Sequence, residues 1–426
     1  GMRLKRLTAW CVALCLTAGL CACTLTGRRT LVLGIYAGSP WLVHESAAYQ
    51  QIDEAIARFE AAHPTVDVVY ESGIRMNDYR QWLNDSVVMG TVPDVFMVPD
   101  DLFGQYASLG VLKNLDPYLR QDDDCAEADF FPAAAQSGKY LYSQYALPFM
   151  MNPRLMFVNV TLLKEAGLQV PEAGWTPEEF VALCQDLTKD RNQDGTADQY
   201  GVVDYGWLDL AEAYGLDLFS DDGRDVKLAD SDVRRVTELY RSLMAFTGNE
   251  AERDMLMEAG RVAFAPMSYA EFVTYNPWPW KVKKYTGFEW ICVNLPQVPD
   301  RKIRFTGDSI VMAMSATTRQ EELAWDLMKE FCSGWQTQTQ ILENSQGMCA
   351  LQTGARHLDS FLESSGVSGD TIRSIMNQEG TRVRFARYES AREQLASQME
   401  KVAASQEDLD LALVETEDSI RSYLRS

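Results

Sequence analysis

The alternation of buried strands with amphipathic helices in the first half of the chain constrains the fold most. The apolar runs Leu31–Tyr36, Val66–Tyr70 and Asp94–Val98 are typical of buried strands. Apolar residues at helical spacing predict helices over about 47–62 and 77–90 between these strands. This β-α-β-α-β order predicts an α/β protein whose mostly parallel sheet carries helices on both faces. Ligands of such sheets bind at the carboxyl ends of the strands.

The second half of the chain continues in the same style. Thr176-Pro177-Glu178-Glu179 is a capping box that predicts a helix start. Strands are expected at 201–203 and 260–267. Further helices are expected at about 231–246, 320–332 and 335–344, and over the acidic tail, about 387–424.

The N-terminus carries an export signal. A basic segment precedes the uncharged apolar run Leu7–Leu20, which is too short for a comfortable membrane span. Leu20-Cys21-Ala22-Cys23 resembles a bacterial lipobox, which implies removal of residues 1–22 and lipidation of Cys23. Residues 23–30 are then a short tether. We expect an exported protein, anchored by lipid to the extracellular or periplasmic face of the cell membrane.

Charge and residue usage exclude several classes of protein. The net charge of −22 argues against nucleic-acid binding, and the three histidines disfavour histidine-rich metal catalysis. Five cysteines remain after Cys23, with no CxxC spacing, which argues against a disulfide framework or a zinc ribbon. A bridge between Cys332 and Cys349 remains open.

Six short motifs follow one another along nearly the whole mature chain. They are Ile56-Ala57-Arg58-Phe59-Glu60, Gly90-Thr91-Val92-Pro93-Asp94-Val95, Ala146-Leu147-Pro148-Phe149, Gly174-Trp175-Thr176-Pro177-Glu178-Glu179-Phe180, Gly260-Arg261-Val262-Ala263-Phe264 and Ala324-Trp325-Asp326-Leu327-Met328. Together and in this order they resemble the extracellular solute-binding proteins of ABC transporters, specifically the carbohydrate-binding family 1.

The resemblance implies a two-lobe periplasmic-binding-protein-like fold with the ligand in a cleft between hinged lobes. One lobe takes about 29–147 and 307–350, and the other takes about 150–304 and 355–426. The implied function is a non-enzymatic receptor, expected to be a monomer, that delivers a sugar or oligosaccharide to an ABC permease. No cofactor is required for this function.

Sugar binding needs aromatic faces for the C–H surface and polar groups for the hydroxyls. Candidates are expected in the loops at strand ends and at the crossings between lobes. The candidate ligand contacts are Tyr36, Trp41, Asp101, Asn152, Tyr205, Trp207, Tyr269, Trp278 and Asp308.

The segment from Asp190 to Asp198 matches the first part of an EF-type calcium loop. Asp190, Asn192, Asp194 and Asp198 supply oxygens, and Gly195 stands at the turn position. The twelfth position is Gly201 rather than a bidentate glutamate. A structural calcium ion and a metal-free polar turn therefore both remain open.

Other functions compete with the sugar receptor. A secreted carbohydrate-active enzyme would need two carboxylates across a scissile bond, and no motif pairs them. GxSxG, P-loop and HExxH motifs are absent from the sequence. A binder of another solute, such as a polyamine, a phosphate ester or an oligopeptide, and a surface adhesin complete the alternatives.

Overall fold

The computed structural model describes residues 27–37, 41, 49–276, 282–378 and 385–426. These residues form two compact units. Unit 1 comprises the chain up to Met151 and Ser309–His357, and unit 2 comprises Asn152–Asp308 and Leu358–Ser426. The chain passes from one unit to the other after residues 151, 308 and 357. These three crossings lie a few residues beyond the lobe limits predicted from the sequence. No helix in the described part of the chain is long and apolar enough to cross a bilayer.

Unit 1 is built on a six-stranded sheet with the order β12-β6-β11-β3-β1-β2. The strand β1 pairs in parallel with β2 and β3, as the β-α-β-α-β pattern predicts, whereas β11 runs antiparallel to β3 and β12 antiparallel to β6. Every residue of β3 is buried, which explains its continuous apolar run. The strands are β1 Arg29–Gly34, β2 Val66–Tyr70, β3 Val95–Pro99, β6 Leu147–Asn152, β11 Asp308–Met314 and β12 Met348–Cys349, and the pair β4 Lys139–Tyr140 and β5 Ser143–Gln144 stands apart.

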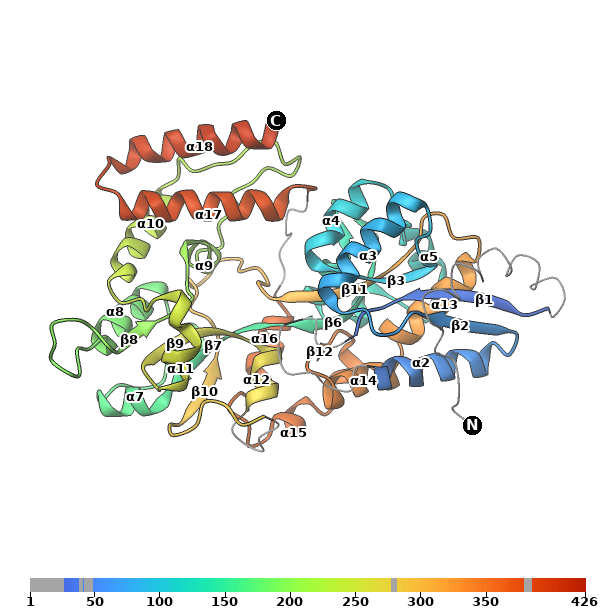
Figure 1. Cartoon of the computed structure of the whole chain (residues 1–426), viewed down its shortest axis with the longest axis horizontal. Coiled ribbons are helices and arrows are strands. Elements are labelled where there is room, and N and C mark those ends of the chain that lie inside the picture. Colours follow the sequence, from blue (N-terminus) through green and yellow to red (C-terminus); the bar gives the residue numbers. More distant parts are fainter. Residues whose placement is uncertain (1–26, 38–40, 42–48, 277–281, 379–384) are drawn as a thin grey trace. The chain divides into compact units, whose positions relative to one another are not determined.

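Helices cover both faces of this sheet (Figure 1). The helices α3 and α4 lie on one face, and α2 packs with α13 and α14 on the other. Gly90 ends α3 with a φ of 71°, a left-handed conformation that favours glycine. The helices are α2 Tyr49–Ala62, α3 Met76–Met89, α4 Asp100–Ser108, α5 Asp116–Gln121, α6 Pro132–Ser137, α13 Glu321–Cys332 and α14 Trp335–Asn344, with 3₁₀ turns at Glu127–Asp129 and Gln352–Ala355.

Unit 2 contains a four-stranded sheet with the order β10-β7-β9-β8. The strand β8 pairs in parallel with β9, and β7 runs antiparallel to both β9 and β10. The strands are β7 Arg154–Asn159, β8 Tyr200–Val202, β9 Val262–Ser268 and β10 Trp290–Val293. The α/β class with two lobes is confirmed, but both sheets are mixed rather than mostly parallel. The reason is that strands entering at the crossings, such as β11, are not joined to their neighbours by β-α-β connections.

Several helices of unit 2 begin at capping side chains. Thr176 Oγ1 accepts from the Glu179 N–H at 3.1 Å and Glu179 Oε2 from the Thr176 N–H at 3.1 Å, so the predicted capping box is confirmed. The predicted tail helix is two helices, because Asp408 caps a second start. The helices are α7 Val160–Glu165, α8 Pro177–Leu187, α9 Trp207–Ala213, α10 Ser231–Met244, α11 Arg253–Glu258, α12 Tyr269–Tyr275, α15 Leu358–Leu362, α16 Gly369–Met376, α17 Tyr388–Ala404 and α18 Leu409–Arg425, with a 3₁₀ turn at Glu250–Glu252.

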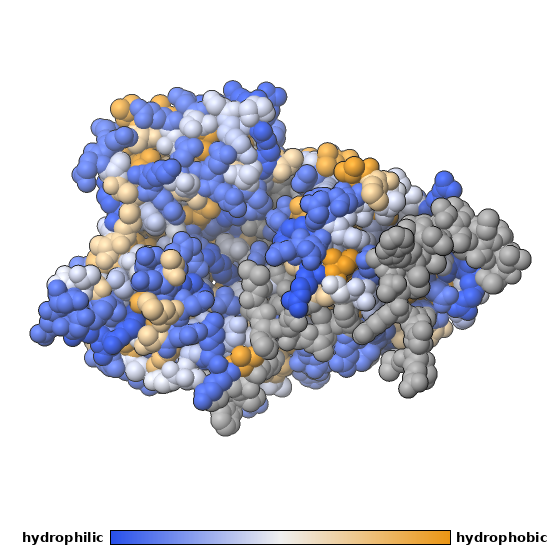
Figure 2. Space-filling view, viewed as in Figure 1, coloured by the Kyte–Doolittle hydropathy of each residue, from blue (hydrophilic) through white to orange (hydrophobic). Residues whose placement is uncertain are grey.

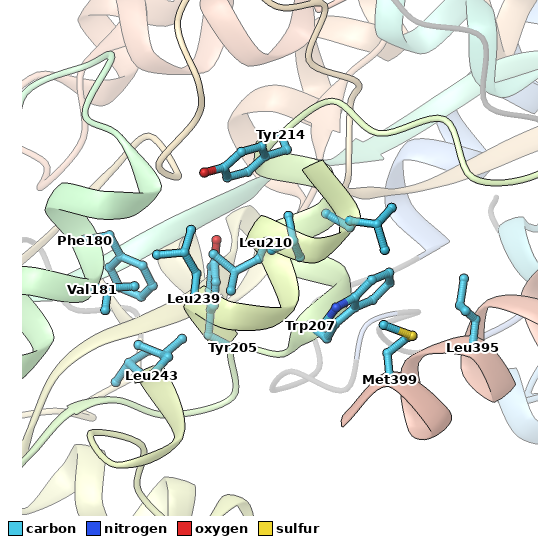
Figure 3. Close-up of a cluster of buried hydrophobic side chains, with 14 of the residues drawn as sticks. Phe180, Val181, Tyr205, Trp207, Leu210, Tyr214, Leu239, Leu243, Leu395 and Met399 are labelled. Atoms are coloured by element: carbon cyan, nitrogen blue, oxygen red, sulfur yellow. The ribbon is translucent and has the colours of Figure 1, made fainter. Parts of the chain in front are cut away.

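The core of unit 2 joins its sheet to the C-terminal helices. Phe180 of α8 and Phe264 of β9 are fully buried and pack edge to face, with ring centroids 5.8 Å apart. Leu395 and Met399 bring α17 into the same cluster (Figure 3). Residues more than 200 positions apart in sequence therefore stabilise one core, and α17 and α18 lie side by side over it (Figure 1).

Candidate functional site

An arginine–carboxylate pair occupies the carboxyl edge of the unit 1 sheet. Asp101 lies in the first turn of α4, directly after β3, where the strand rule places ligand contacts. Arg80 of α3 donates from Nε and Nη2 to the two oxygens of Asp101, both at 3.1 Å. The side chains are 35% and 49% exposed, so this fork keeps surface for further hydrogen bonds.

Aromatic side chains support the same edge. Tyr36 follows β1 and packs edge to face on Tyr79, with ring centroids 5.5 Å apart. The Tyr79 hydroxyl donates to the backbone oxygens of Gly34 at 3.2 Å and Met97 at 2.6 Å, which ties α3 to β1 and β3. Burial raises the pKa of Tyr36 far above its ordinary value, and nearby Arg80 opposes this rise. Tyr36 therefore stays protonated and is mostly enclosed.

Trp41 is partly buried beside a glycine that makes room for it. A Cβ atom added to Gly347 would lie 2.2 Å from Met150 Cγ and 3.1 Å from Trp41 Cζ3. Gly347 thus allows the indole and the β6 side chain to approach the segment before β12. Asp308, the first residue of β11, is exposed. Its neighbour Ser309 donates from Oγ to Asp100 at 3.3 Å.

The corresponding edge of unit 2 carries a second arginine–carboxylate pair. Arg154, the first residue of β7, forms an ion pair with Asp209 in the first turn of α9. Asp204 follows β8 in a left-handed conformation, with a φ of 61°. Burial raises the pKa of Asp204, and the charges of Arg253 and Arg154 oppose this rise. Opposite charges therefore meet where β8 ends and β7 begins.

A polar hollow lies beside Asp204 in unit 2. Its lining consists of Asp204, Glu250, Ala251, Arg253, Asp254 and Glu271. The side chain of Arg253 is 18% exposed and bridges Glu271 at 3.3 Å, Asp254 at 3.1 Å and Asp204 at 3.5 Å. One guanidinium faces several carboxylates, so the hollow has a net negative charge.

Four predicted contacts of unit 2 lie inside its core or at a helix cap, and their contact with a ligand stays a prediction. Trp207 is fully buried, and its Nε1 donates to Thr237 Oγ1 at 3.0 Å. Figure 3 shows its indole beside Leu395 and Met399 of α17. Tyr205 and Tyr269 are buried, and Asn152 accepts from the Ala270 N–H at 2.9 Å, at the start of α12. Trp278 lies outside the described residues.

Several charged residues of these edges were not among the site residues predicted from the sequence. Arg80, Arg154, Arg253 and Glu271 belong to no motif, and their side chains meet carboxylates or guanidinium groups only through the fold. Arg154 could have been found, because it lies a few residues after the lobe boundary expected between residues 147 and 150.

The residues of the predicted calcium loop form a turn held by its own backbone. Asp190 Oδ2 accepts from the Gly195 N–H at 2.8 Å, and Asp194 Oδ1 from the Thr196 N–H at 2.8 Å. Asp198 Oδ1 accepts from the Arg191 N–H at 2.8 Å. Within the described ranges, no group of three or more His, Cys, Asp or Glu side chains could hold a metal ion. Calcium binding stays a prediction, tested below.

The five described cysteines are all buried free thiols. Cys332 Sγ faces the backbone oxygen of Leu147 at 3.8 Å, and Cys349 Sγ that of Leu351 at 3.6 Å. The bridge between Cys332 and Cys349 that the sequence left open is therefore not formed.

Comparison with known proteins places the chain in a family. Residues 44–332 match the model of the bacterial extracellular solute-binding proteins. The chain is 24% identical over 294 residues to a maltotriose-binding protein of Pyrococcus abyssi, and 28% identical over 139 residues to a lipoprotein of Streptomyces antibioticus. These alignments cover 66% and 32% of this chain, but only 59% and 30% of the relatives.

Solved structures share the fold over nearly the whole chain. The sugar-binding protein MalE of Xanthomonas citri covers 93% of this chain and 97% of its own, with a TM-score of 0.76 and 17% identity. A substrate-binding protein of Listeria monocytogenes in complex with cycloalternan covers 93% and 99%, with a TM-score of 0.69 and 18% identity. The chain therefore has the fold of ABC substrate-binding proteins and belongs to the bacterial extracellular solute-binding protein family.

Proposed function

We propose that this chain is an exported receptor that binds a sugar or oligosaccharide and delivers it to the membrane subunits of an ABC permease. Membership of the solute-binding family supports the receptor role. Support for a carbohydrate comes from the names of its relatives and neighbours, which include a maltotriose-binding protein and structures in complex with cycloalternan and mannotriose.

The half-exposed fork of Arg80 and Asp101 carries the proposal in this molecule. A carboxylate has about four lone-pair sites, and a guanidinium has five N–H donors, so neither group is saturated by the other. A sugar offers adjacent hydroxyls that both donate and accept. Asp101 can therefore accept a hydrogen bond from one sugar hydroxyl while Arg80 donates to a neighbouring hydroxyl oxygen, at the edge where ligands of such sheets bind.

A receptor and a carbohydrate-active enzyme differ in whether the bound sugar is converted to products. The relative from Pyrococcus abyssi and the MalE structure are named as binding proteins, and a receptor returns its ligand unchanged. The test incubates the mature chain with a neutral oligosaccharide panel and follows both binding by calorimetry and products by chromatography. We expect saturable binding and intact sugar, and catalytic formation of products would contradict the proposal.

Anchoring through Cys23 is the second part of the proposal. The lipobox-like Leu20-Cys21-Ala22-Cys23 supports it, since the resemblance makes Cys23 the acceptor of lipid. Replacement Cys23→Ser should move the protein from the membrane fraction to the medium or the soluble extracellular fraction. The replacement Cys125→Ser is a matched control, because that thiol is buried and should not affect anchoring. Unchanged membrane retention of Cys23→Ser would refute the anchor.

A cationic solute such as a polyamine is the second candidate. The hollow around Arg253 favours it, because four carboxyl groups line the hollow with one guanidinium. The binding panel therefore includes spermidine beside the sugars. Tight spermidine binding without sugar binding would replace the first candidate by the second.

A further inference from the structure

Three large apolar side chains are exposed together on unit 1. Val88 and Met89 end α3 and are 86% and 69% exposed, and Leu109, directly after α4, is 62% exposed. We call these three residues the apolar corner. Apolar side chains are visible over the part of unit 1 that contains α3 and α4 (Figure 2). Each side chain alone would be ordinary, but their grouping needs an explanation.

A hydrogen bond holds the ends of the two helices together. The Tyr106 hydroxyl donates to Asn84 Oδ1. Asn84 lies one helical turn before Val88, and Tyr106 lies three residues before Leu109, so the corner residues extend beyond this bond on both helices. The corner is therefore a fixed feature of unit 1.

The corner lies at the amino edge of the sheet, opposite the edge that carries Asp101. The helix α3 leads into β3, and α4 runs back from its carboxyl end, so both helices finish at the amino edge. Asp94, which follows the end of α3, accepts from the Val32 N–H of β1 at 2.9 Å. Asp94 is therefore level with the middle of β1, three residues beyond the start of that strand at Arg29.

The chain enters unit 1 at this same edge. β1 begins at Arg29, six residues after Cys23. Six residues span at most about 20 Å when fully extended. A lipid on Cys23 would therefore hold the amino edge within roughly that distance of the bilayer surface.

Positive charge accompanies the apolar corner. Arg29 and Arg319 are exposed, and neither has a carboxylate partner in the part of the chain that the structure describes. Arg319 stands beside β1, because its neighbour Gln320 donates to the Thr30 backbone oxygen at 2.8 Å. Two unpaired guanidinium groups are notable on a chain with a net charge of −22. Apolar side chains and arginines at the same edge of the sheet match a membrane interface with anionic lipids.

We infer that the amino edge of unit 1 is a second membrane contact, in which the apolar corner enters the headgroup region and Arg29 and Arg319 meet anionic lipid. This inference rests on the proposed lipid anchor at Cys23. The contact would hold unit 1 at the bilayer surface by its amino edge.

The test places a fluorophore at the corner of the full lipidated chain. Met89→Cys supplies the labelling site, since the described native thiols are buried and Cys23 carries the lipid. Leu411→Cys on α18 is the control, because Leu411 is equally apolar and 59% exposed but belongs to unit 2. The probes are phosphatidylcholine–phosphatidylglycerol vesicles with nitroxide-labelled lipid, and flotation reports attachment of the chain.

We expect the fluorophore at position 89 to be quenched and that at 411 to remain bright. In the unlipidated mature chain, Arg29→Gln and Arg319→Gln should each weaken binding to the anionic vesicles about fivefold. Flotation with equal fluorescence at both positions would overturn the membrane contact and leave the anchor intact. Absence of flotation would overturn the anchor and this inference together, whereas calorimetry with sugar reports the receptor function separately.

Discussion

The replacement Asp101→Ala tests whether the carboxyl edge of unit 1 binds ligand. In the free protein, the ion pair with Arg80 is half exposed, so its loss should change the free energy of unfolding by only about 0–1 kcal/mol. In the complex, the ligand hydroxyls lose hydrogen bonds to a charged group, each worth about 1.5–3 kcal/mol. We therefore expect the Kd, measured by calorimetry, to rise about 10- to 150-fold.

The pair of Arg28 and Asp67 provides a matched control for this prediction. It is also an exposed two-bond pair, with Arg28 Nε at 3.0 Å and Nη2 at 2.6 Å from the carboxylate of Asp67. It lies at the amino edge of the same sheet, where β1 and β2 begin. Asp67→Ala should therefore leave the Kd unchanged. Equal affinities for Asp101→Ala, Asp67→Ala and the parent chain would refute the placement of the ligand at the carboxyl edge.

Three further predictions concern stability. Trp207→Ala should lower the free energy of unfolding, followed by thermal melts, by about 3–5 kcal/mol, because it leaves a cavity in the core. A melting temperature equal to that of the parent chain would contradict the core position of Trp207. Burial acts to raise the pKa of Asp122, but hydrogen bonds from Lys329 and Trp325 outweigh this and lower it. Its contribution to stability is therefore present above about pH 4 and lost as the pH falls further. Asp122→Asn should flatten the acid arm of a stability–pH curve, and an unchanged arm would refute this origin. The oxygens of Asp190, Asp194 and Asp198 accept from backbone N–H groups of the loop itself, and the twelfth position lacks the bidentate glutamate of a calcium loop. Excess chelator should therefore leave the melting temperature unchanged, whereas a drop that calcium reverses would establish a calcium site.

Much of the fold could be predicted because local patterns and tertiary packing agree. The capping box at Thr176 and the buried run of β3 are local signals that the structure keeps. The direction of β11 could not be predicted in the same way. It enters unit 1 at a crossing, so its partner β3 is more than 200 residues away in sequence. The break between α17 and α18 was visible only as a weak signal, the capping Asp408 in an otherwise helical tail.

The site was harder to predict, because the position of the backbone does not determine where a side chain points. The strand rule located Asp101 correctly after β3, but its partner Arg80 comes from a helix face with no distinguishing motif. The same rule placed Trp207 after β8, yet its indole enters the core, where α10 supplies Thr237 as a partner. Whether the indole points into the core or to the surface depends on distant residues such as Met399, which no local pattern connects to Trp207.

Calorimetric titration of the mature chain with a panel of neutral oligosaccharides tests the central proposal most directly. We expect saturable one-to-one binding of at least one sugar, with an affinity that falls in Asp101→Ala but not in Asp67→Ala. Failure of every sugar to bind, in a preparation that melts cooperatively and binds spermidine, would contradict it.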